Sequence, residues 1–201
     1  EKAAEIIDRT DRFAIGICSC RHEHEHLESA PASRARARSP RGGRAPAGES
    51  AGRSCKVPLD TCSSFGATSV DFMVRHGLAR EVSKQEMLDN VARSRDLGLV
   101  LNADNVQRNV SFMCHCCGCC CNVLRGITCH GYPNAVVTSN YIAASDPERC
   151  IGCGICSRRC PIQAIDRVSD PDPRYRKFGR PVVDESLCIG CGVCTLRCKP
   201  G

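Results

Sequence analysis

Cysteine is the residue type whose number and spacing could do chemistry in this chain. Nineteen of the 201 residues are cysteine, and eight of them lie in two copies of the pattern C-x2-C-x2-C-x3-C. The copies read CIGCGICSRRCP and CIGCGVCTLRCKP, and each cysteine of the first recurs 38 residues later in the second. The corresponding cysteines are Cys150 and Cys188, Cys153 and Cys191, Cys156 and Cys194, and Cys160 and Cys198. Because thiolates bind soft metal centres, this duplicated spacing predicts two metal centres rather than a set of disulfides.

The duplicated run resembles the two-cluster [4Fe-4S] ferredoxin domain of bacteria, in which the fourth cysteine of each run ligates the other cluster. The resemblance assigns Cys150, Cys153, Cys156 and Cys198 to cluster one, and Cys188, Cys191, Cys194 and Cys160 to cluster two. It also implies a pseudo-two-fold βαβ repeat. The ferredoxin-type domain of the resemblance covers residues 140–201. Each iron would already carry a protein ligand, which favours outer-sphere electron transfer and assigns no catalytic residue. Eight zinc thiolates are the alternative, but zinc sites rarely use crossed four-cysteine runs.

Ten further cysteines are candidate metal ligands, of which we expect only a subset to bind. They are Cys18, Cys20, Cys55, Cys62, Cys114, Cys116, Cys117, Cys119, Cys120 and Cys121. If segment 28–54 loops out, the first four can converge as thiolates, because loop closure costs little extra entropy. Four thiolates suit a third iron-sulfur cluster or a structural zinc ion. Unligated cysteines packed in a core are the alternative.

The last six of these cysteines fall within eight positions, 114–121. We expect a strand over 110–113 to lead into a tight loop that carries them, with Gly118 allowing the turn. A subset of three or four could hold a [4Fe-4S] cluster, or could complete the site begun by Cys18 and Cys20. A zinc knuckle or a partly free thiol cluster is the alternative, although exposed free thiols would invite oxidation. His115 is a possible further ligand, and the roles of Cys129 and His130 stay open.

Three histidines alternate with glutamates at positions 22, 24 and 26. On a strand they would share one face and could form a metal site. The alternative, which we favour, is a solvated polar edge.

The motifs C-x-C-R-H, P-L-x-T-C-x-x-F and C-x-C-C-x-C-C-C precede the ferredoxin run. Their combination resembles a group of bacterial and archaeal 4Fe-4S dicluster proteins with an N-terminal cysteine-rich region. The resemblance covers most of the chain except the Arg-rich segment 28–54. It implies an electron-transfer component of anaerobic metabolism and names no reaction.

Local patterns predict the elements that position these cysteines. Residues 1–12 are compatible with a short helix, and the alternation over 13–17 predicts a strand that leads into Cys18. A helix is expected to end near Gly77. The capping box formed by Ser83 and Glu86 predicts another helix that runs to about residue 95 and stops at Gly98, before a strand over 99–102. Since these predicted helices and this strand have no basic face that could recognise DNA, we interpret them as a scaffold.

In the C-terminal part, a first strand is expected to include Val136, Val137, Tyr141 and Ile142, with a returning strand at 182–183. The first three ligands of the first run are placed in a loop, and Cys160 at the head of a short helix.

Composition narrows the functional classes. Six arginines and two glutamates in segment 28–54 account for +4 of the net charge of +6, so the rest of the chain is nearly balanced and nucleic-acid binding is not indicated. Segment 28–54 has no hydrophobic periodicity and is predicted to be a flexible insertion.

No signal peptide or membrane-spanning apolar run is visible, and metal-type cysteine spacing indicates a reducing, cytoplasmic setting. The absence of an initial Met suggests a fragment of a longer chain.

Together these observations predict an α+β chain. A cysteine-rich metal-binding domain would occupy 1–133, interrupted at 28–54, and a two-cluster ferredoxin-type domain 134–201. The leading interpretation is an electron-transfer protein or subunit that passes single electrons to or from a redox partner protein through two [4Fe-4S] clusters. One further [4Fe-4S] cluster or a zinc ion is expected in the N-terminal region. The alternatives are an iron-sulfur oxidoreductase with substrate chemistry at the N-terminal site, and a redox or metal sensor.

Overall fold

The computed structural model describes residues 2–28, 55–136 and 139–200. They form two compact units, the first ending at Cys121 and the second beginning at Asn122. The domain boundary predicted from the sequence lies later, between residues 133 and 134. The insertion predicted at 28–54 falls outside the described residues except for Glu28, the last residue of a helix.

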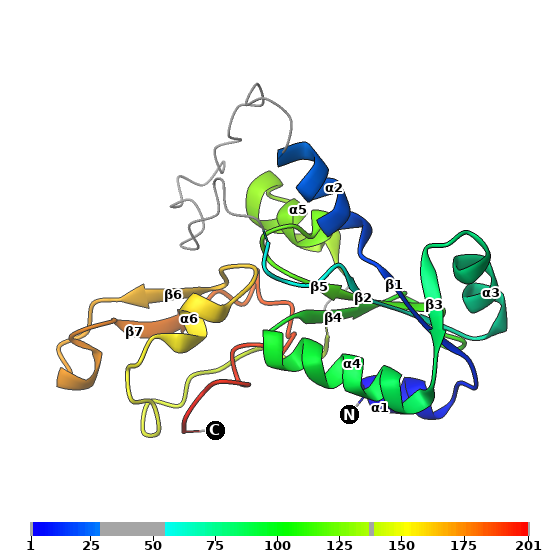
Figure 1. Ribbon diagram of the computed structural model, residues 1–201. Coiled ribbons are helices and arrows are strands. Elements are labelled where there is room, and N and C mark those ends of the chain that lie inside the picture. Colours follow the sequence, from blue (N-terminus) through cyan, green and yellow to red (C-terminus); the bar gives the residue numbers. More distant parts are fainter. Residues whose placement is uncertain (1, 29–54, 137–138, 201) are drawn as a thin grey trace. The chain divides into compact units, whose positions relative to one another are not determined.

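The first unit is built on a five-stranded antiparallel sheet in the order β3-β1-β2-β5-β4 (Figure 1). The strands are β1 (Phe13–Ile17), β2 (Asp60–Phe65), β3 (Ala79–Val82), β4 (Val100–Ala103) and β5 (Phe112–Cys116). Strand β2 pairs on one side with β1, Gly16 opposite Cys62, and on the other with β5, Ser63 opposite Met113. Segments that are far apart in the sequence therefore lie side by side in the sheet.

Four helices belong to this unit: α1 (Lys2–Asp8), α2 (Ser19–Glu28), α3 (Ala67–Arg75) and α4 (Lys84–Leu97). The predicted ends of α4 are confirmed. The Ser83 side chain accepts a hydrogen bond from the Glu86 backbone N–H, and Gly98 ends the helix in the left-handed region at φ 74°. Both groups satisfy backbone polar atoms that a helix end leaves without an internal partner.

The hydrophobic core lies between the sheet and the helices α1 and α4, which run side by side along it (Figure 1). Its fully buried members are Ile7, Phe13, Ile15, Phe65, Met87 and Met113. Because side chains alternate along a strand, the residues one or three positions from these in β1, β2 and β5 face away from α4. Cys62 and Cys114 are among them, so the sheet separates its thiols from its apolar core.

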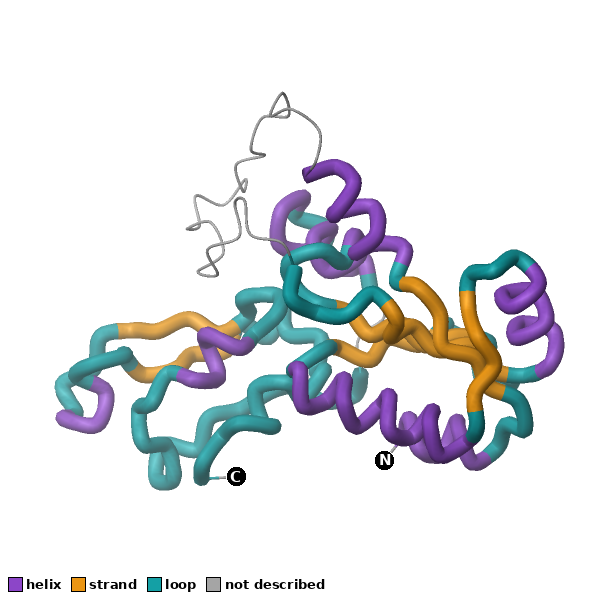
Figure 2. Tube along the Cα trace, in the orientation of Figure 1, coloured by secondary structure: helices purple, strands orange, loops and turns teal. Residues whose placement is uncertain are grey.

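The second unit consists largely of loops with short elements, as Figure 2 shows for the C-terminal part of the chain. Its elements are α5 (Asn122–His130), η1 (Pro133–Ala135), α6 (Ile155–Arg159), β6 (Ile165–Val168), η2 (Pro173–Tyr175) and β7 (Arg180–Val183). Strands β6 and β7 form an antiparallel pair, which includes the returning strand expected at 182–183.

Two expectations for this unit were wrong, and a third, the pseudo-two-fold repeat, is not confirmed. No strand forms over the described part of 136–142, because the backbone there pairs with no other strand. Tyr141 in this segment is 66% exposed. Cys160 stands at the C-terminal cap of α6, not at the head of a helix. The second cysteine run has turns where the first has α6, so the βαβ repeat is not reproduced in both halves.

One expectation for the first unit also needs correction, and the condition for the less favoured histidine site is not met. Strand β5 continues to Cys116, so Cys114 and Cys116 lie in a strand and not in the loop that follows. The three histidines lie on helix α2, where alternate residues do not share a face. His22 and His26 are instead one turn apart, with ring centroids separated by 4.2 Å.

None of the helices in the described ranges is both long enough and apolar enough to cross a membrane.

Candidate metal centres

Four cysteines of the first unit bring their sulfurs together in one place. The Sγ atoms of Cys55, Cys117, Cys119 and Cys120 all lie within 4.8 Å of one another. Cys55 comes from the segment before β2, and the other three from the loop after β5. The sulfur of Cys55 is 3.9 Å from that of Cys117 and 3.5 Å from that of Cys119. We call these four residues the compact thiol group.

The spacing in the compact thiol group indicates the size of the centre it can hold. Four sulfurs at about 2.3 Å from one zinc ion stand about 3.8 Å apart at the corners of a tetrahedron. Three of the sulfur distances in the group, at 3.5–3.9 Å, are close to this figure, and all of them are within 4.8 Å. The cysteines that hold a cuboidal cluster sit outside a cube of four irons and are spread further apart. The group therefore fits a single tetrahedral ion better than a [4Fe-4S] cluster.

The surroundings of this group favour a thiolate. Cys117 and Cys120 are buried and pack against Leu99, with Val57 beside them. A hydrogen bond from Cys119, assisted by the Arg21 guanidinium, lowers the pKa of Cys117 to about 4, although burial opposes the shift. Metal ions bind the deprotonated form of cysteine. The lowered pKa of Cys117 therefore favours the form of its side chain that can bind a metal ion.

Five other cysteines form a more open arrangement beside strands β1, β2 and β5. Cys62 is in hydrogen-bonding contact with Cys18 on one side and Cys114 on the other. Cys116 contacts Cys114 and also Cys121. We call Cys18, Cys62, Cys114, Cys116 and Cys121 the open thiol group. The sequence grouped Cys55 with Cys18, Cys20 and Cys62, whereas the structure places Cys55 in the compact thiol group; Cys20 lies half-buried in the first turn of α2.

Arg21 lies fully buried between the two thiol groups. Its guanidinium donates to the backbone carbonyl of His115 at 2.9 Å and to the Thr61 hydroxyl, and lies 4.0 Å from the Cys117 sulfur. Burial alone lowers the pKa of Arg21, but the nearby thiols of Cys18 and Cys117 raise it overall. The side chain is therefore a buried cation whose potential counter-charges are cysteine sulfurs.

His115 is not arranged as a metal ligand. Its Nε2 is 2.9 Å from the Ser63 hydroxyl and its Nδ1 is 2.6 Å from that of Ser94. Burial lowers the pKa of His115 to about 4, so the ring is neutral and one nitrogen donates while the other accepts. Asn90 of α4 donates to the backbone carbonyl of Thr61 at 2.9 Å. These contacts attach α4 to β2 and β5 and fix the strands that carry the thiols.

In the second unit, Cys160 lies within electrostatic range of three cysteines of the second run. It interacts with Cys188, and Cys191 and Cys194 each interact with both. This is the set that the resemblance assigned to cluster two. In the first run, Cys156 interacts with Cys150 and Cys153, while Cys198 is exposed.

The loops around these cysteines approach neighbouring backbone so closely that two glycines have no space for a side chain. Gly152 and Gly190 occupy equivalent positions in the two runs, both at φ 64°. A Cβ atom on Gly152 would lie 2.0 Å from the Arg174 carbonyl oxygen, and one on Gly190 would lie 2.1 Å from that of Tyr141. Only glycine tolerates both this backbone conformation and this approach. The close loops leave backbone N–H groups near sulfur, as between Ala164 N and Cys160 Sγ at 3.2 Å.

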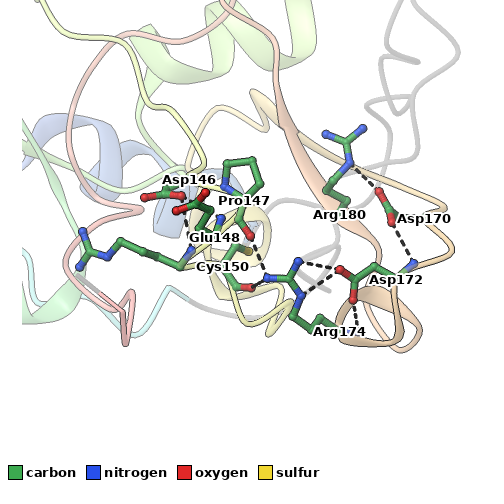
Figure 3. A network of polar contacts seen from close by, with 9 residues as sticks. Asp146, Pro147, Glu148, Cys150, Asp170, Asp172, Arg174 and Arg180 are labelled. Carbon is green, nitrogen blue, oxygen red and sulfur yellow. Dashed lines mark hydrogen bonds and ion pairs between the residues drawn. The ribbon is translucent and has the colours of Figure 1, made fainter.

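Arg174 supports the loop that carries Cys150 through hydrogen bonds to its backbone (Figure 3). Its guanidinium donates to the backbone carbonyls of Pro147, at 2.8 Å, and Cys150, at 3.3 Å. Asp172 holds the same guanidinium with contacts of 2.6 and 2.9 Å. Nearby, Asp170 pairs with Arg180 at 2.8 Å. The charged segment between the runs thus supports a ligand loop, at least through these residues.

Sequence reasoning did not single out Arg21 or Arg174. Arg21 follows Cys20 directly in the C-x-C-R-H motif, and that position was the available signal. Arg174 stands in a segment rich in charges, and nothing in its local pattern distinguishes it from its neighbours.

Comparison with known proteins identifies one part of the chain. Residues 149–201 match the family of the 4Fe-4S dicluster domain. The search of curated proteins and the search of solved structures found no match. The C-terminal part is thus similar to two-cluster iron-sulfur domains, and this family match covers none of the first unit.

Proposed function

We propose that the chain is an iron-sulfur electron-transfer protein, or the electron-transfer subunit of an oxidoreductase, that relays single electrons through two [4Fe-4S] clusters. The observation that carries the proposal is the match of residues 149–201 to the 4Fe-4S dicluster domain, over all eight cysteines of the duplicated run. Clusters of this type supply one-electron chemistry whose potential depends on charge, hydrogen bonds to sulfur and exposure. The donor and the acceptor would be partner proteins.

The proposal includes crossed ligation. Cys160 would serve the cluster of the second run and Cys198 that of the first. The electrostatic grouping of Cys160 with Cys188, Cys191 and Cys194 supports this assignment. Because each cluster would tie the two runs together, neither run would keep its loop conformation without the other.

The residues around the clusters would tune and hold them without taking part in bond making. The Ala164 and Ala143 N–H groups point to the sulfurs of Cys160 and Cys188, at 3.2 and 3.5 Å. Such hydrogen bonds stabilise the more negative, reduced state of a cluster. Arg174 holds the loop of Cys150 by its backbone and places a positive charge near that cluster.

The compact thiol group is proposed to hold one tetrahedral metal ion, zinc or iron. Its sulfur spacing supports a mononuclear centre. With four cysteine ligands the ion would be closed to substrate, so the function we favour for it is structural. It would order the loop after β5, which has no secondary structure until α5.

Metal analysis of the intact chain tests the proposal. After anaerobic purification we expect about eight irons and eight inorganic sulfides from the dicluster domain, plus one tetrahedral ion in the compact thiol group. Reduction should give two magnetically interacting S = 1/2 signals by EPR. Fewer than about six irons in intact anaerobic protein would contradict the proposal.

Substitution separates the two ligand sets. Cys160→Ser should remove the EPR signal of the cluster bound by the second run and leave that of the first. Cys129→Ser is the matched control, because Cys129 is also a half-buried cysteine of the second unit but lies on α5, outside both runs. If Cys160→Ser instead removed the signal of the cluster held by Cys150, Cys153 and Cys156, ligation would not be crossed.

A further inference from the structure

We propose that the open thiol group is a second metal centre of the first unit, distinct from the compact thiol group and from the dicluster. Its ligands would be drawn from Cys18, Cys62, Cys114, Cys116 and Cys121, and it would take a thiophilic metal, either a zinc ion or an iron-sulfur cluster. This inference goes beyond the electron-transfer function and does not depend on it.

The sheet itself assembles the group. Cys62 lies opposite Gly16 on β1, and the register that pairs Ser63 with Met113 sets Cys62 next to Cys114 on β5. Cys116 is two residues further along β5, on the same face as Cys114. Cys18 follows directly on β1, and its N–H donates to the Leu59 carbonyl at 2.8 Å beside the start of β2. Cys62 on β2 and Cys114 and Cys116 on β5 thus meet Cys18, which directly follows the adjacent strand β1, on the face turned away from α4.

The sulfurs of this group form a continuous series of contacts. Cys18 touches Cys62, Cys62 touches Cys114, and Cys114 touches Cys116. Cys116 in turn contacts Cys121, beyond the loop. Among the described residues, the set whose ligand atoms all lie within 4.8 Å of one another is the compact thiol group. The open group therefore spans more space, which suits a centre larger than one ion, and it has one sulfur more than four ligands require.

Arg21 places a positive charge beside the open thiol group. The guanidinium is fully buried and faces Cys18 and Cys62 of the open group as well as Cys117 of the compact group. A buried cation is strongly destabilising unless negative charge surrounds it. Neutral thiols at Cys18 and Cys62 do not supply that charge, whereas thiolates bound to a metal do, since each thiol releases its proton as the metal–sulfur bond forms. The position of Arg21 thus favours metal-bound sulfur on the side of the open thiol group.

Paired double variants of the full chain test the proposal. Cys18→Ser with Cys62→Ser disables the open group, and Cys55→Ser with Cys119→Ser disables the compact group. Iron, zinc and inorganic sulfide are counted per chain after anaerobic purification. We expect each double variant to lose the complement of its own centre and to keep that of the other, together with the EPR signals of the dicluster. Loss of iron and sulfide together identifies a cluster in the open group, and loss of zinc alone identifies an ion.

Two results would overturn the proposal. One is a Cys18→Ser, Cys62→Ser chain that retains the full N-terminal metal content of the wild type. The other is the loss of the same single complement in both double variants while the circular dichroism spectrum stays that of the wild type. The EPR signals of the dicluster report separately on the proposed function. Their absence from the wild-type chain would contradict that function and is distinguishable from a failure of the open thiol group to bind metal.

A measurement on the wild-type chain covers the case in which the variants do not fold. Cys62 and Cys114 are only half-buried, so burial alone does not protect them. We expect both to resist anaerobic alkylation in the metal-replete protein and to react after chelators remove the metals, as read by mass spectrometry. Cys129, half-buried in the second unit, should react in both states. Equal reaction of Cys62 and Cys114 before and after metal removal would overturn the proposal.

Discussion

Burying an arginine costs free energy unless its guanidinium meets negative charge and hydrogen-bond acceptors. Arg21 has two oxygen acceptors, the His115 carbonyl and the Thr61 hydroxyl, while its Nε has no hydrogen-bond partner within the described ranges. Its other neighbours are the sulfurs of both thiol groups. A single side chain thus couples the electrostatics of two candidate centres.

Arg21→Met should therefore destabilise the first unit. We expect a loss of about 3–5 kcal/mol in the free energy of unfolding, because one partner of a buried set of charges is removed. Thermal unfolding of the metal-loaded chain measures the loss, and metal counting shows whether occupancy falls with it. Arg21→Lys should restore part of the metal content by returning the charge, and Arg75→Met, at an exposed position of α3, should change neither quantity. If Arg21→Met left the midpoint and the metal content unchanged, Arg21 would have no role in the centres.

Gly190 offers a second test at the scale of one residue. Gly190→Ala should reduce the occupancy of the cluster of the second run, because the added Cβ would lie about 2 Å from Ser139 Oγ and the Tyr141 carbonyl oxygen. Gly192→Ala is the matched control. Its φ of 73° carries a similar backbone penalty, but the nearest atom to its Cβ is 4.0 Å away. Iron content and EPR intensity should therefore fall much further for Gly190→Ala, and equal losses would show that the close approach is unimportant.

At the scale of elements, the ends of helix α4 are specified by residues close to them in the sequence, whereas the pairing of the strands depends on residues far apart in the sequence. The ends of α4 were predictable because the Ser83 cap and the Gly98 stop depend on neighbouring residues only. The distribution of thiols was not, because it depends on strand register. Cys55, in the segment before β2, meets Cys117 and Cys119 in the loop after β5, and no spacing in the sequence reports that contact. The ferredoxin spacing, by contrast, is local within each run and could be recognised directly.

Helix α4 provides a test of how far scaffold stability and metal binding are separable. Ser83→Ala should lower the free energy of unfolding by about 1 kcal/mol through loss of the N-terminal cap. Metal content should stay at the wild-type level, because the residues of α4 that contact β2 and β5, such as Asn90 and Ser94, lie further along the helix. Chemical unfolding and metal counting check both statements. Gln85→Ala, an exposed change in the same turn, is the control; a loss of metal in Ser83→Ala would contradict the separation.

At the scale of the whole molecule, the described residues divide into two units whose candidate centres draw on separate sets of cysteines. The thiol groups of the first unit use cysteines up to Cys121, and the dicluster uses those from Cys150 onward. Metal binding stabilises the fold that holds the ligands. Each unit should therefore respond to the loss of its own metals.

A chelator experiment follows from this division. If the compact thiol group holds zinc, a strong zinc chelator added anaerobically should lower the unfolding temperature of the first unit and leave the visible absorbance of the [4Fe-4S] clusters unchanged. Brief exposure to oxygen should do the reverse, bleaching the clusters first. Calorimetry and absorbance follow the two units in one sample. Bleaching of the clusters at the rate of zinc loss would show that the units do not hold their metals independently.

The run from Cys114 to Cys121 supplies both thiol groups. Cys114, Cys116 and Cys121 belong to the open group, and Cys117, Cys119 and Cys120 to the compact group. The conformational entropy of this segment is lost when either site fills, so the second metal would bind to a backbone that is already ordered. The second metal should then bind more tightly than the first, which a metal titration would show as positive cooperativity. The eight-residue segment would thus help the two centres of the first unit to fill together, while each can still fill alone.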